Sequence, residues 1–328
     1  MQIRALVAVL AAAASFNACA QSAIVIKFSH VVAPDTPKGQ AAERFKLLAE
    51  RLTKGRVKVE VYPNSQLYKD KEELEALQLG AVQMLAPSLA KFGPLGVKEF
   101  EAFDLPYIFP SKAALYKVTE GPIGRSLLQK LEPKGITGLA YWDNGFKVMS
   151  ANKPLRTPAD FRGLKMRIQS SRVLDAQMRA LGASPQALAF SEVYAALHDG
   201  VVDGTENTPS NLYTQKMHEV QKHLTLSNHG YLGYAVIVNR KFWAGLPADI
   251  RSQLAQAMRD ATAFEKAIAE RDNALALEAI RKSGKTAIYT LTPQQQGEWR
   301  AAMLPVQKQM EPRIGKELVE AINKEVAR

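Results

Sequence analysis

The sequence is nearly free of cysteine, and its single one, Cys19, lies within the first twenty residues. This segment begins with a basic residue, Arg4, continues as an apolar run and ends in small residues around Cys19, which is the pattern of a secretory signal peptide. We expect residues 1–20 to be cleaved, which leaves a mature chain without disulfide or thiol chemistry. A membrane anchor and a lipidated Cys19 are the alternatives, although the apolar run is shorter than the roughly 20 residues of a spanning helix.

Long hydrophobic runs are absent from the rest of the chain, although 47% of all residues are hydrophobic. A chain of 328 residues can bury a full core and is long enough for two domains. We therefore expect a globular mature protein that is exported and soluble outside the cytoplasmic membrane.

Signatures of catalysis and of metal binding are missing too. The sequence has no Gly-x-Ser-x-Gly elbow, no phosphate-binding loop, no dinucleotide fingerprint and no His-Glu-x-x-His. Its five histidines show no standard metal-ligand spacing, so we expect neither a metal nor a cofactor. His218 and His223 are expected to face solvent from a helix, whereas a functional role stays open for His30 at the end of a predicted strand.

Runs of basic residues are also absent, despite a net charge of +11. The basic residues are spread along predicted helices beside Glu or Asp, as in KDKEELEAL, which is typical of a solvated helix face. The sequence shows neither a zinc-finger spacing nor a basic strand interleaved with aromatics, so nucleic acid is not an expected partner. The positive surplus favours anions, and a small anion fits this pattern better.

What the sequence does contain is an alternation of strand and helix patterns. Residues 24–32, 56–62 and 82–88 have the pattern of strands, and helical patterns separate them. This order predicts a parallel sheet with helices on its faces. A comparable pattern restarts at residue 135, so we expect two α/β units in one chain.

Residues 248–283 contain neither glycine nor proline, and apolar residues recur along them at roughly helical spacing. This segment is longer than the ordinary globular helix of about 8 to 20 residues. We expect one continuous helix that lies against both α/β units, with two helices and an unmarked break as the alternative.

Arg167 lies in a predicted strand at residues 164–169, where apolar residues alternate with Lys165, Arg167 and Gln169. The spacing leaves two alternatives for Arg167, a solvated sheet face or a ligand cleft. An arginine in a cleft suits a carboxylate because its planar fork donates two parallel hydrogen bonds and keeps its charge. Lys165 is expected to be solvated.

Further polar side chains collect in loops near the ends of predicted strands, where ligands of α/β folds are bound. Each of them, taken alone, is compatible with an ordinary solvated loop. These candidates are Lys38, Ser88, Lys91, Asn144, Lys147 and Asn207.

Several motifs, in order and at matching separations, resemble the periplasmic solute-binding proteins of tripartite ATP-independent (TRAP) transporters, specifically the DctP type associated with C4-dicarboxylates. The resemblance covers essentially all of the mature chain. The matching stretches include IKFSHVVAPDTPKGQAAERF, FDLPYIF, TPADFRGLKMRIQSS and DGTENTPSN.

The resemblance assigns residues to a ligand cleft between two lobes. It makes Arg167 the main carboxylate clamp, with Asn207 fixing the same carboxylate and Lys147 as a second basic residue, and it implies an aromatic lining by Phe190. Its less certain members are Lys38, Ser88, Lys91, Asn144, Gln169 and Tyr234. His30 joins the candidates from its place at a strand end.

The implied fold is α/β, a two-lobed periplasmic-binding-protein fold (type II-like, TRAP type) with a long helix spanning both lobes. Domain I would take residues 22–143 and 233–270, and domain II residues 144–232 and 271–328. The implied function is capture of a small organic acid anion, such as malate, succinate or fumarate, by lobe closure. A monomer without enzymatic activity would then deliver the anion to membrane permease subunits.

Three alternatives stay open. The chain could be a secreted enzyme acting on an organic acid, with His30 as its base. It could bind another carboxylate, such as a keto acid or a sugar acid. It could also present its ligand to a sensory receptor instead of a permease.

Overall fold

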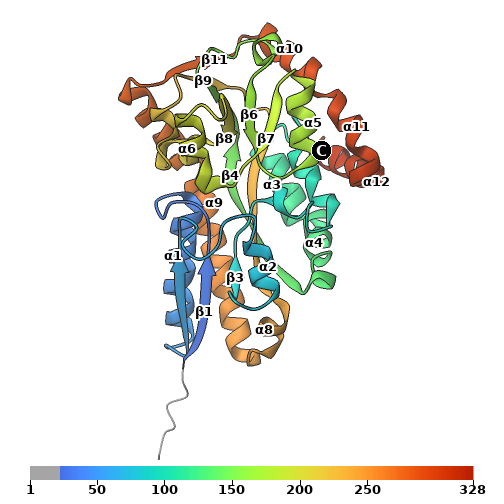
Figure 1. Cartoon of the computed structure of the whole chain (residues 1–328). Coiled ribbons are helices and arrows are strands. Elements are labelled where there is room, and N and C mark those ends of the chain that lie inside the picture. Colours follow the sequence, from blue (N-terminus) through green and yellow to red (C-terminus); the bar gives the residue numbers. More distant parts are fainter. Residues whose placement is uncertain (1–22, 328) are drawn as a thin grey trace, which may run out of the picture.

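A computed structural model of the chain describes residues 23–327, so the expected signal peptide lies outside the described residues. Two mixed sheets lie in opposite halves of the molecule, each covered by helices (Figure 1). This arrangement confirms the predicted two-lobed α/β fold. Within the described residues, no helix is both long enough and apolar enough to cross a membrane.

The first sheet consists of β1 (Ile24–Ser29), β2 (Val57–Tyr62), β3 (Met84–Leu85), β4 (Ile136–Phe146) and β10 (Tyr231–Asn239). Their order is β2-β1-β3-β10-β4. β1 pairs in parallel with β2 and β3, as predicted, because a helix returns the chain to the same end of the sheet each time. β10 runs antiparallel to β3 and β4, so the prediction of a parallel sheet holds only for the N-terminal part.

The second sheet consists of β5 (Val148–Ala151), β6 (Lys165–Ile168), β7 (Ser184–Ala187), β8 (Gly204–Asn207), β9 (His223–Leu226) and β11 (Ala287–Thr290). Their order is β11-β9-β5-β8-β6-β7. β6 is parallel to both β7 and β8, whereas β5 is antiparallel to β8 and β9. The expected helical position of His223 is wrong, because this residue opens strand β9.

Helices cover both sheets. The α-helices are α1 (Pro37–Leu52), α2 (Glu73–Gln78), α3 (Lys112–Glu120), α4 (Pro122–Gln129), α5 (Arg172–Ala180), α6 (Val193–His198), α7 (Pro209–Thr214), α8 (Arg240–Gly245), α9 (Ala248–Ser283), α10 (Pro293–Met303), α11 (Pro305–Ile314) and α12 (Lys316–Val326). The 3-10 helices are η1 (Leu89–Lys91), η2 (Lys98–Asp104), η3 (Glu132–Lys134), η4 (Pro158–Phe161), η5 (Phe190–Glu192) and η6 (Met217–Glu219).

The chain passes between the two sheets three times. β4 of the first sheet runs into β5 of the second through the single residue Lys147. Residues 227–230 lead back from β9 to β10, and α9 makes the third passage before β11. The lobes are therefore joined by two strand crossings and one helix.

α9 is one continuous helix of 36 residues, which confirms the sequence expectation and excludes a break. At about 1.5 Å per residue it is roughly 54 Å long. Leu254 and Met258 pack with Phe45 in the core of the first sheet, whereas Ile280 packs with Leu197 beside the second. The apolar stripe that the sequence shows is therefore divided between the two lobes.

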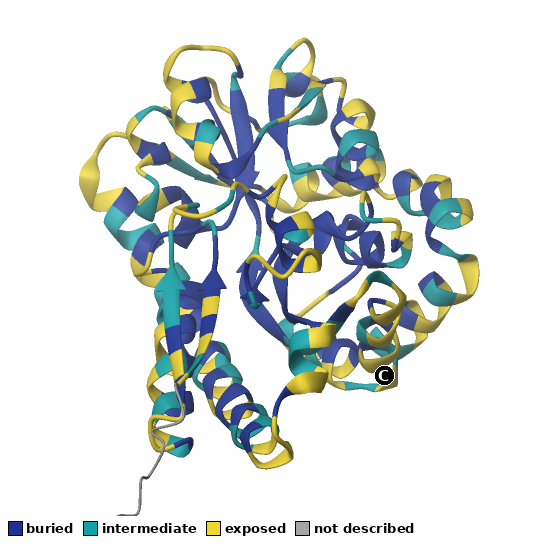
Figure 2. Cartoon of the chain, turned by 60° about the horizontal axis from the view of Figure 1, so that its bottom comes forward, coloured by how far each residue is buried: buried dark blue, intermediate teal, exposed yellow. Residues whose placement is uncertain are grey.

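The C-terminal helices α11 and α12 pack against η2 and α3 (Figure 1). Val306 and Ile322 share a cluster with Phe100 and Leu115. In both lobes the buried residues follow the strands and the inward faces of helices (Figure 2). His218 is one of them and stacks on Tyr213 with ring centroids 5.0 Å apart, so its expected exposure to solvent is wrong.

Candidate functional site

A small cavity lies between the two sheets. Eight of the eleven predicted site residues line it. They are Lys38, Ser88, Lys91, Arg167, Gln169, Phe190, Asn207 and Tyr234. The remaining lining residues are Val31, Val32, Asp70, Glu73, Asn211 and Leu232.

Arg167 is buried in the wall that β6 forms, with 1% of its surface exposed. Its Nε and Nη2 both donate to the carbonyl oxygen of Leu188, at 3.1 and 2.8 Å. The centre of the Phe190 ring lies 5.9 Å from the guanidinium carbon. Among the described residues, no carboxylate lies within ion-pairing distance of Arg167. Burial lowers the pKa of the guanidinium, while Asp70 and Glu206 oppose this, and an arginine keeps its charge in proteins. The remaining N–H groups are therefore free to donate to an anion.

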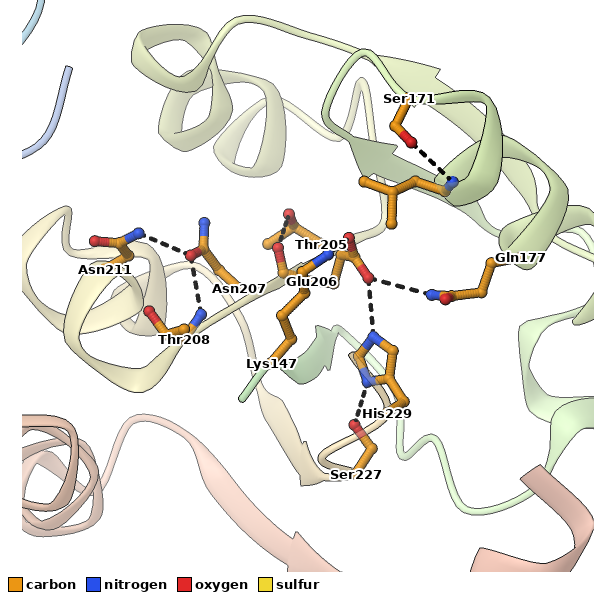
Figure 3. A network of polar contacts seen from close by, with 11 residues as sticks. Lys147, Ser171, Gln177, Thr205, Glu206, Asn207, Thr208, Asn211, Ser227 and His229 are labelled. Atoms are coloured by element: carbon orange, nitrogen blue, oxygen red, sulfur yellow. Dashed lines mark hydrogen bonds and ion pairs between the residues drawn. The ribbon is translucent and has the colours of Figure 1, made fainter. Parts of the chain in front are cut away.

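Asn207 ends β8 with its amide held in one orientation (Figure 3). Its Oδ1 accepts from the backbone N–H of Thr208 and from Nδ2 of Asn211, both at 2.9 Å. Since both partners are donors, the oxygen faces them and Nδ2 is left to donate to a ligand. Asn211 Nδ2 also donates to Tyr234 Oη at 3.4 Å, which connects the two walls of the cavity.

Lys38 comes from the opposite wall, where α1 begins. Thr36 Oγ1 caps this helix by accepting from the backbone N–H of Gly39 (3.1 Å), so Lys38 lies in the first turn. Its Nζ donates to Ala86 O (3.0 Å) and lies 3.7 Å from the centre of the Tyr234 ring. Burial lowers the pKa of Lys38 to about 8.

Lys91 and Asp70 form a buried ion pair, with Nζ and Oδ2 2.5 Å apart. Asp70 Oδ1 also accepts from the backbone N–H of Phe190 (3.3 Å), which belongs to the other lobe. Burial alone would raise the pKa of Asp70, but Lys91 outweighs it and the pKa is lowered. Lys91 thus has a fixed counter-ion, whereas Arg167 and Lys38 have none at ion-pairing distance among the described residues.

Ser88 and Gln169 complete the polar lining. Ser88 is buried and bridges to Tyr234 through the backbone, and its Oγ has no hydrogen-bond partner in the described part of the chain. A free hydroxyl in the wall is a donor for a carboxylate oxygen. Gln169, two residues beyond Arg167, is half-buried at the same wall.

Three predicted residues do not line the cavity. Lys147 Nζ pairs with Glu206 Oε1 at 2.7 Å, and the other Glu206 oxygen contacts His229 Nε2 at 2.8 Å (Figure 3). Asn144 Nδ2 donates to Thr208 Oγ1 at 2.8 Å, behind Asn207. The structure gives both residues protein partners, and direct contact with a ligand stays a prediction.

His30 is the third of these residues. It is buried, and neither ring nitrogen has a hydrogen-bond partner among residues 23–327. Burial and then the charge of Lys38 lower its pKa to about 3, so the imidazole is neutral at physiological pH. A direct role for His30 at the ligand also stays a prediction.

Sequence reasoning missed Asp70, Glu73 and Asn211. The first two stand in KDKEELEAL, which was expected to be a solvated helix face. Both residues are instead buried, with 5% of the surface of Asp70 and 1% of the surface of Glu73 exposed. The helical spacing of this segment could have indicated that Glu73 is buried. Glu73 lies four residues before Leu77, and residues with this spacing share one helix face. Glu73 is therefore on the apolar face that packs inward.

A metal site has no support in the described part of the chain, which contains no group of three or more His, Cys, Asp or Glu side chains that could hold an ion. The cavity contains instead two cations without counter-ions, an oriented amide and a free hydroxyl. Groups of this kind bind carboxylates.

The fold thus defines a two-lobed binding protein with its cavity between the lobes. A family model, the bacterial extracellular solute-binding proteins of family 7 (DctP), matches residues 28–313. The chain belongs to this family, which confirms the resemblance seen in its motifs.

Characterised relatives are similar over nearly the full length. The C4-dicarboxylate-binding periplasmic protein DctP of Rhodobacter capsulatus is 66% identical over 299 residues, covering 91% of this chain and 90% of that protein. A TRAP solute-binding protein from Sulfurospirillum deleyianum with bound succinate is 48% identical, with a TM-score of 0.89 and coverage of 92% and 98%. Another from Pseudomonas aeruginosa with bound L-malate is 45% identical, with a TM-score of 0.85 and coverage of 87% and 99%.

Proposed function

We propose that this chain is the extracytoplasmic solute-binding protein of a TRAP transporter and that its ligand is a C4-dicarboxylate such as succinate, malate or fumarate. One observation carries this proposal above the others. Arg167 and Lys38 approach the same buried cavity from opposite lobes, and neither has a carboxylate within ion-pairing distance among the described residues. A ligand with an anion at each end would neutralise both.

The proposed mechanism is closure of the two lobes around the ligand. One carboxylate would receive hydrogen bonds from Arg167 and Asn207, and the other would receive them from Lys38 and Ser88. Closure removes water, and each charge-assisted hydrogen bond is stronger in the less polar surroundings. Only a ligand with two anionic ends uses both sets of donors, which favours dicarboxylates over monocarboxylates.

The same proposal covers location and partners. The relatives with characterised ligands are named as periplasmic or solute-binding proteins, which supports export of this chain by its N-terminal segment. We propose that it acts as a monomer in the periplasm, that the closed form docks on membrane permease subunits, and that it releases its ligand chemically unchanged.

A thermal-shift screen of the mature protein tests the ligand class. A ligand at about 100 times its Kd adds about 2.7 kcal/mol to stability, and about 1 kcal/mol raises Tm by roughly 2–4 °C in a chain of this size. We expect succinate, L-malate and fumarate to raise Tm by several degrees, and butyrate, lactate and galactonate to have little effect. A shift with galactonate and none with the dicarboxylates would contradict the proposal. NMR of L-malate incubated with the protein should show no product.

A further inference from the structure

Glu73 has no evident role in anion binding, yet its carboxyl group lines the cavity. The residue is 1% exposed, and its Oε1 is buried without a hydrogen-bond partner among the residues that the structure describes. Among the described residues, no lysine or arginine lies within ion-pairing distance of it. An ionised carboxylate without a partner is costly at such a site, and more so once a second anion arrives.

The charges of the cavity wall determine how many negative charges the closed site can balance. The wall carries three cations, Lys38, Lys91 and Arg167. Asp70 neutralises Lys91 through the ion pair at 2.5 Å, which leaves the two charges of Lys38 and Arg167. A dicarboxylate dianion balances these two charges only when Glu73 is neutral. With Glu73 ionised, the closed site would hold one uncompensated negative charge.

Groups from every neighbouring element act on this balance. Lys38 on α1 and Lys91 on η1 favour ionised Glu73, whereas Asp70, which precedes α2, disfavours it. More distant carboxylates act on the cations of the wall. Glu265 of α9 favours the charged form of Lys38 and so raises its pKa, and Glu206 and Glu192 do the same for Arg167. His30 is neutral and adds no charge.

We propose that Glu73 takes up one proton from solution when a dicarboxylate binds, and that the resulting carboxylic acid donates its O–H to a ligand carboxylate. This inference rests on the proposed function. The ligand stays a dianion, and the only bond formed is the O–H of Glu73, whose proton comes from solution. Glu73 thereby becomes a further ligand-binding residue, a donor that completes the set formed by Arg167, Asn207, Lys38 and Ser88.

The protonation behaviour of the free site supports this step. Burial, with Asp70 adding to it and Lys38 opposing it, raises the pKa of Glu73 to about 7. Near neutral pH, about half of the ligand-free molecules therefore carry a proton on Glu73. Asp70 is the other carboxyl in the wall, but its pKa is lowered, so it stays ionised.

Proton uptake has a measurable consequence for affinity. When the complex holds one more proton than the free protein, affinity falls as pH rises, by up to about tenfold per pH unit. We expect succinate affinity to decline above about pH 7, where Glu73 of the free protein loses its proton. Below that pH, affinity should become independent of pH until the ligand itself is protonated.

Calorimetry with succinate, in buffers of different ionisation heat, counts the protons. We expect Glu73 to take up about half a proton at about pH 7 and close to one at about pH 8. Because the pKa of Lys38 is lowered to about 8, this lysine can also gain a proton there. Infrared difference spectra separate the two groups, since only protonated Glu73 adds the C=O stretch of a carboxylic acid.

Two variants complete the test. Glu73→Gln keeps the shape and a donor, so it should bind succinate, lack the acid band and take up fewer protons at about pH 7. Glu75→Gln, an exposed carboxyl of the same helix, should behave as wild type. Binding by the wild type without proton uptake, or with uptake but no acid band, would overturn this inference alone. Absence of any succinate binding would overturn the proposed function and this inference with it.

Discussion

On strand β6, two positive side chains two residues apart meet different surroundings. Lys165 is exposed, as the sequence analysis expected, whereas Arg167 is 1% exposed and is held by the Leu188 carbonyl. A buried guanidinium with free N–H groups has a high affinity for a carboxylate, because ligand binding replaces no competing counter-ion. This pair therefore offers a test with a built-in control.

Arg167→Ala should weaken succinate binding by roughly 30-fold or more. Truncating one partner of a buried charge pair costs about 2 to 5 kcal/mol, and about 1.4 kcal/mol is tenfold in affinity. Lys165→Ala, the matched control, should change Kd by less than about twofold, because exposed charges contribute little. Titration calorimetry measures both. Equal affinity of Arg167→Ala and wild type would remove Arg167 from the site.

Residues of the cavity differ in how far sequence could predict them. Arg167 stands in a strand whose apolar alternation leaves its surroundings undecided, and only the neighbouring motifs favour the cleft. Glu73 and Asp70 carry charges in a helical pattern rich in charge, which resembles a solvated surface. Their burial depends on how α2 packs against the first sheet, and that contact joins segments distant in sequence. Local patterns contain no information on it.

At the scale of elements, a buried polar network connects the two strand crossings to the second sheet. Lys147 lies between β4 and β5, Glu206 is on β8 and His229 precedes β10, so one ion-pair network joins both strand crossings to the sheet (Figure 3). Ser227 Oγ adds a contact to His229 Nδ1 at 2.7 Å. The resemblance assigned Lys147 to the ligand, and this contact stays a prediction. Its ion pair with Glu206 could not be predicted from the sequence, because the partner on β8 becomes adjacent only in the folded sheet.

Lys147→Met should destabilise the ligand-free protein by about 3 to 5 kcal/mol, because it leaves Glu206 buried without its cation. Lys153→Met, at an exposed position just beyond β5, serves as the control and should unfold like wild type. Urea denaturation measures both. Unchanged stability of Lys147→Met would show that the pair is not structural.

The same network sets a pH dependence. Burial alone would raise the pKa of Glu206, but Lys147 and His229 outweigh it and lower the pKa to about 2. A carboxyl with a depressed folded-state pKa contributes stability that is complete above its unfolded pKa of about 4.3 and is lost as pH falls towards 2. The free energy of unfolding of the wild type should therefore fall as the pH is lowered from about 5 to 2. In Lys147→Met it should fall less steeply over the same range.

At the scale of the whole molecule, α9 connects the lobes through Asn273. Its Nδ2 donates to the carbonyl oxygen of Asn144 at the end of β4 (2.6 Å), and its Oδ1 accepts from the backbone N–H of Ser210 on α7 (3.0 Å). Gly145 has a φ of +113°, and a Cβ there would lie 3.2 Å from Asn273 Nδ2. The hydrogen bonds of Asn273 hold the crossing strand against the helix, and the close approach leaves little room for a side chain at position 145.

Asn273→Ala should weaken succinate binding by about 2- to 10-fold, since lost hydrogen bonds of this kind are worth about 0.5 to 1.5 kcal/mol. We expect the weaker binding to arise because closure of the lobes around succinate has a less favourable free energy. X-ray scattering should show the same radius of gyration as wild type at saturating succinate, reached at higher ligand concentration. Lys282→Ala, near the exposed end of α9, is the control. Wild-type affinity of Asn273→Ala would exclude this role.

The architecture itself was largely predictable, and its exceptions share one origin. The alternation of strands and helices predicted two α/β units, and the absence of glycine and proline predicted α9 as one helix. The antiparallel placement of β10 and β5 was not predicted, because it results from the chain returning between lobes. Strand direction after such a return depends on tertiary path and not on local periodicity.

The three passages of the chain between the lobes also bear on how ligands are selected. A single flexible link would let two bodies twist and slide freely, whereas a crossing of one residue, a crossing of four residues and a helix of roughly 54 Å restrict how the two lobes can move. For the proposed closure, we expect Arg167 and Lys38 to approach each other along the same path each time and to stop at the same separation. The distance between the two carboxylates of a ligand should then decide which dicarboxylates bind.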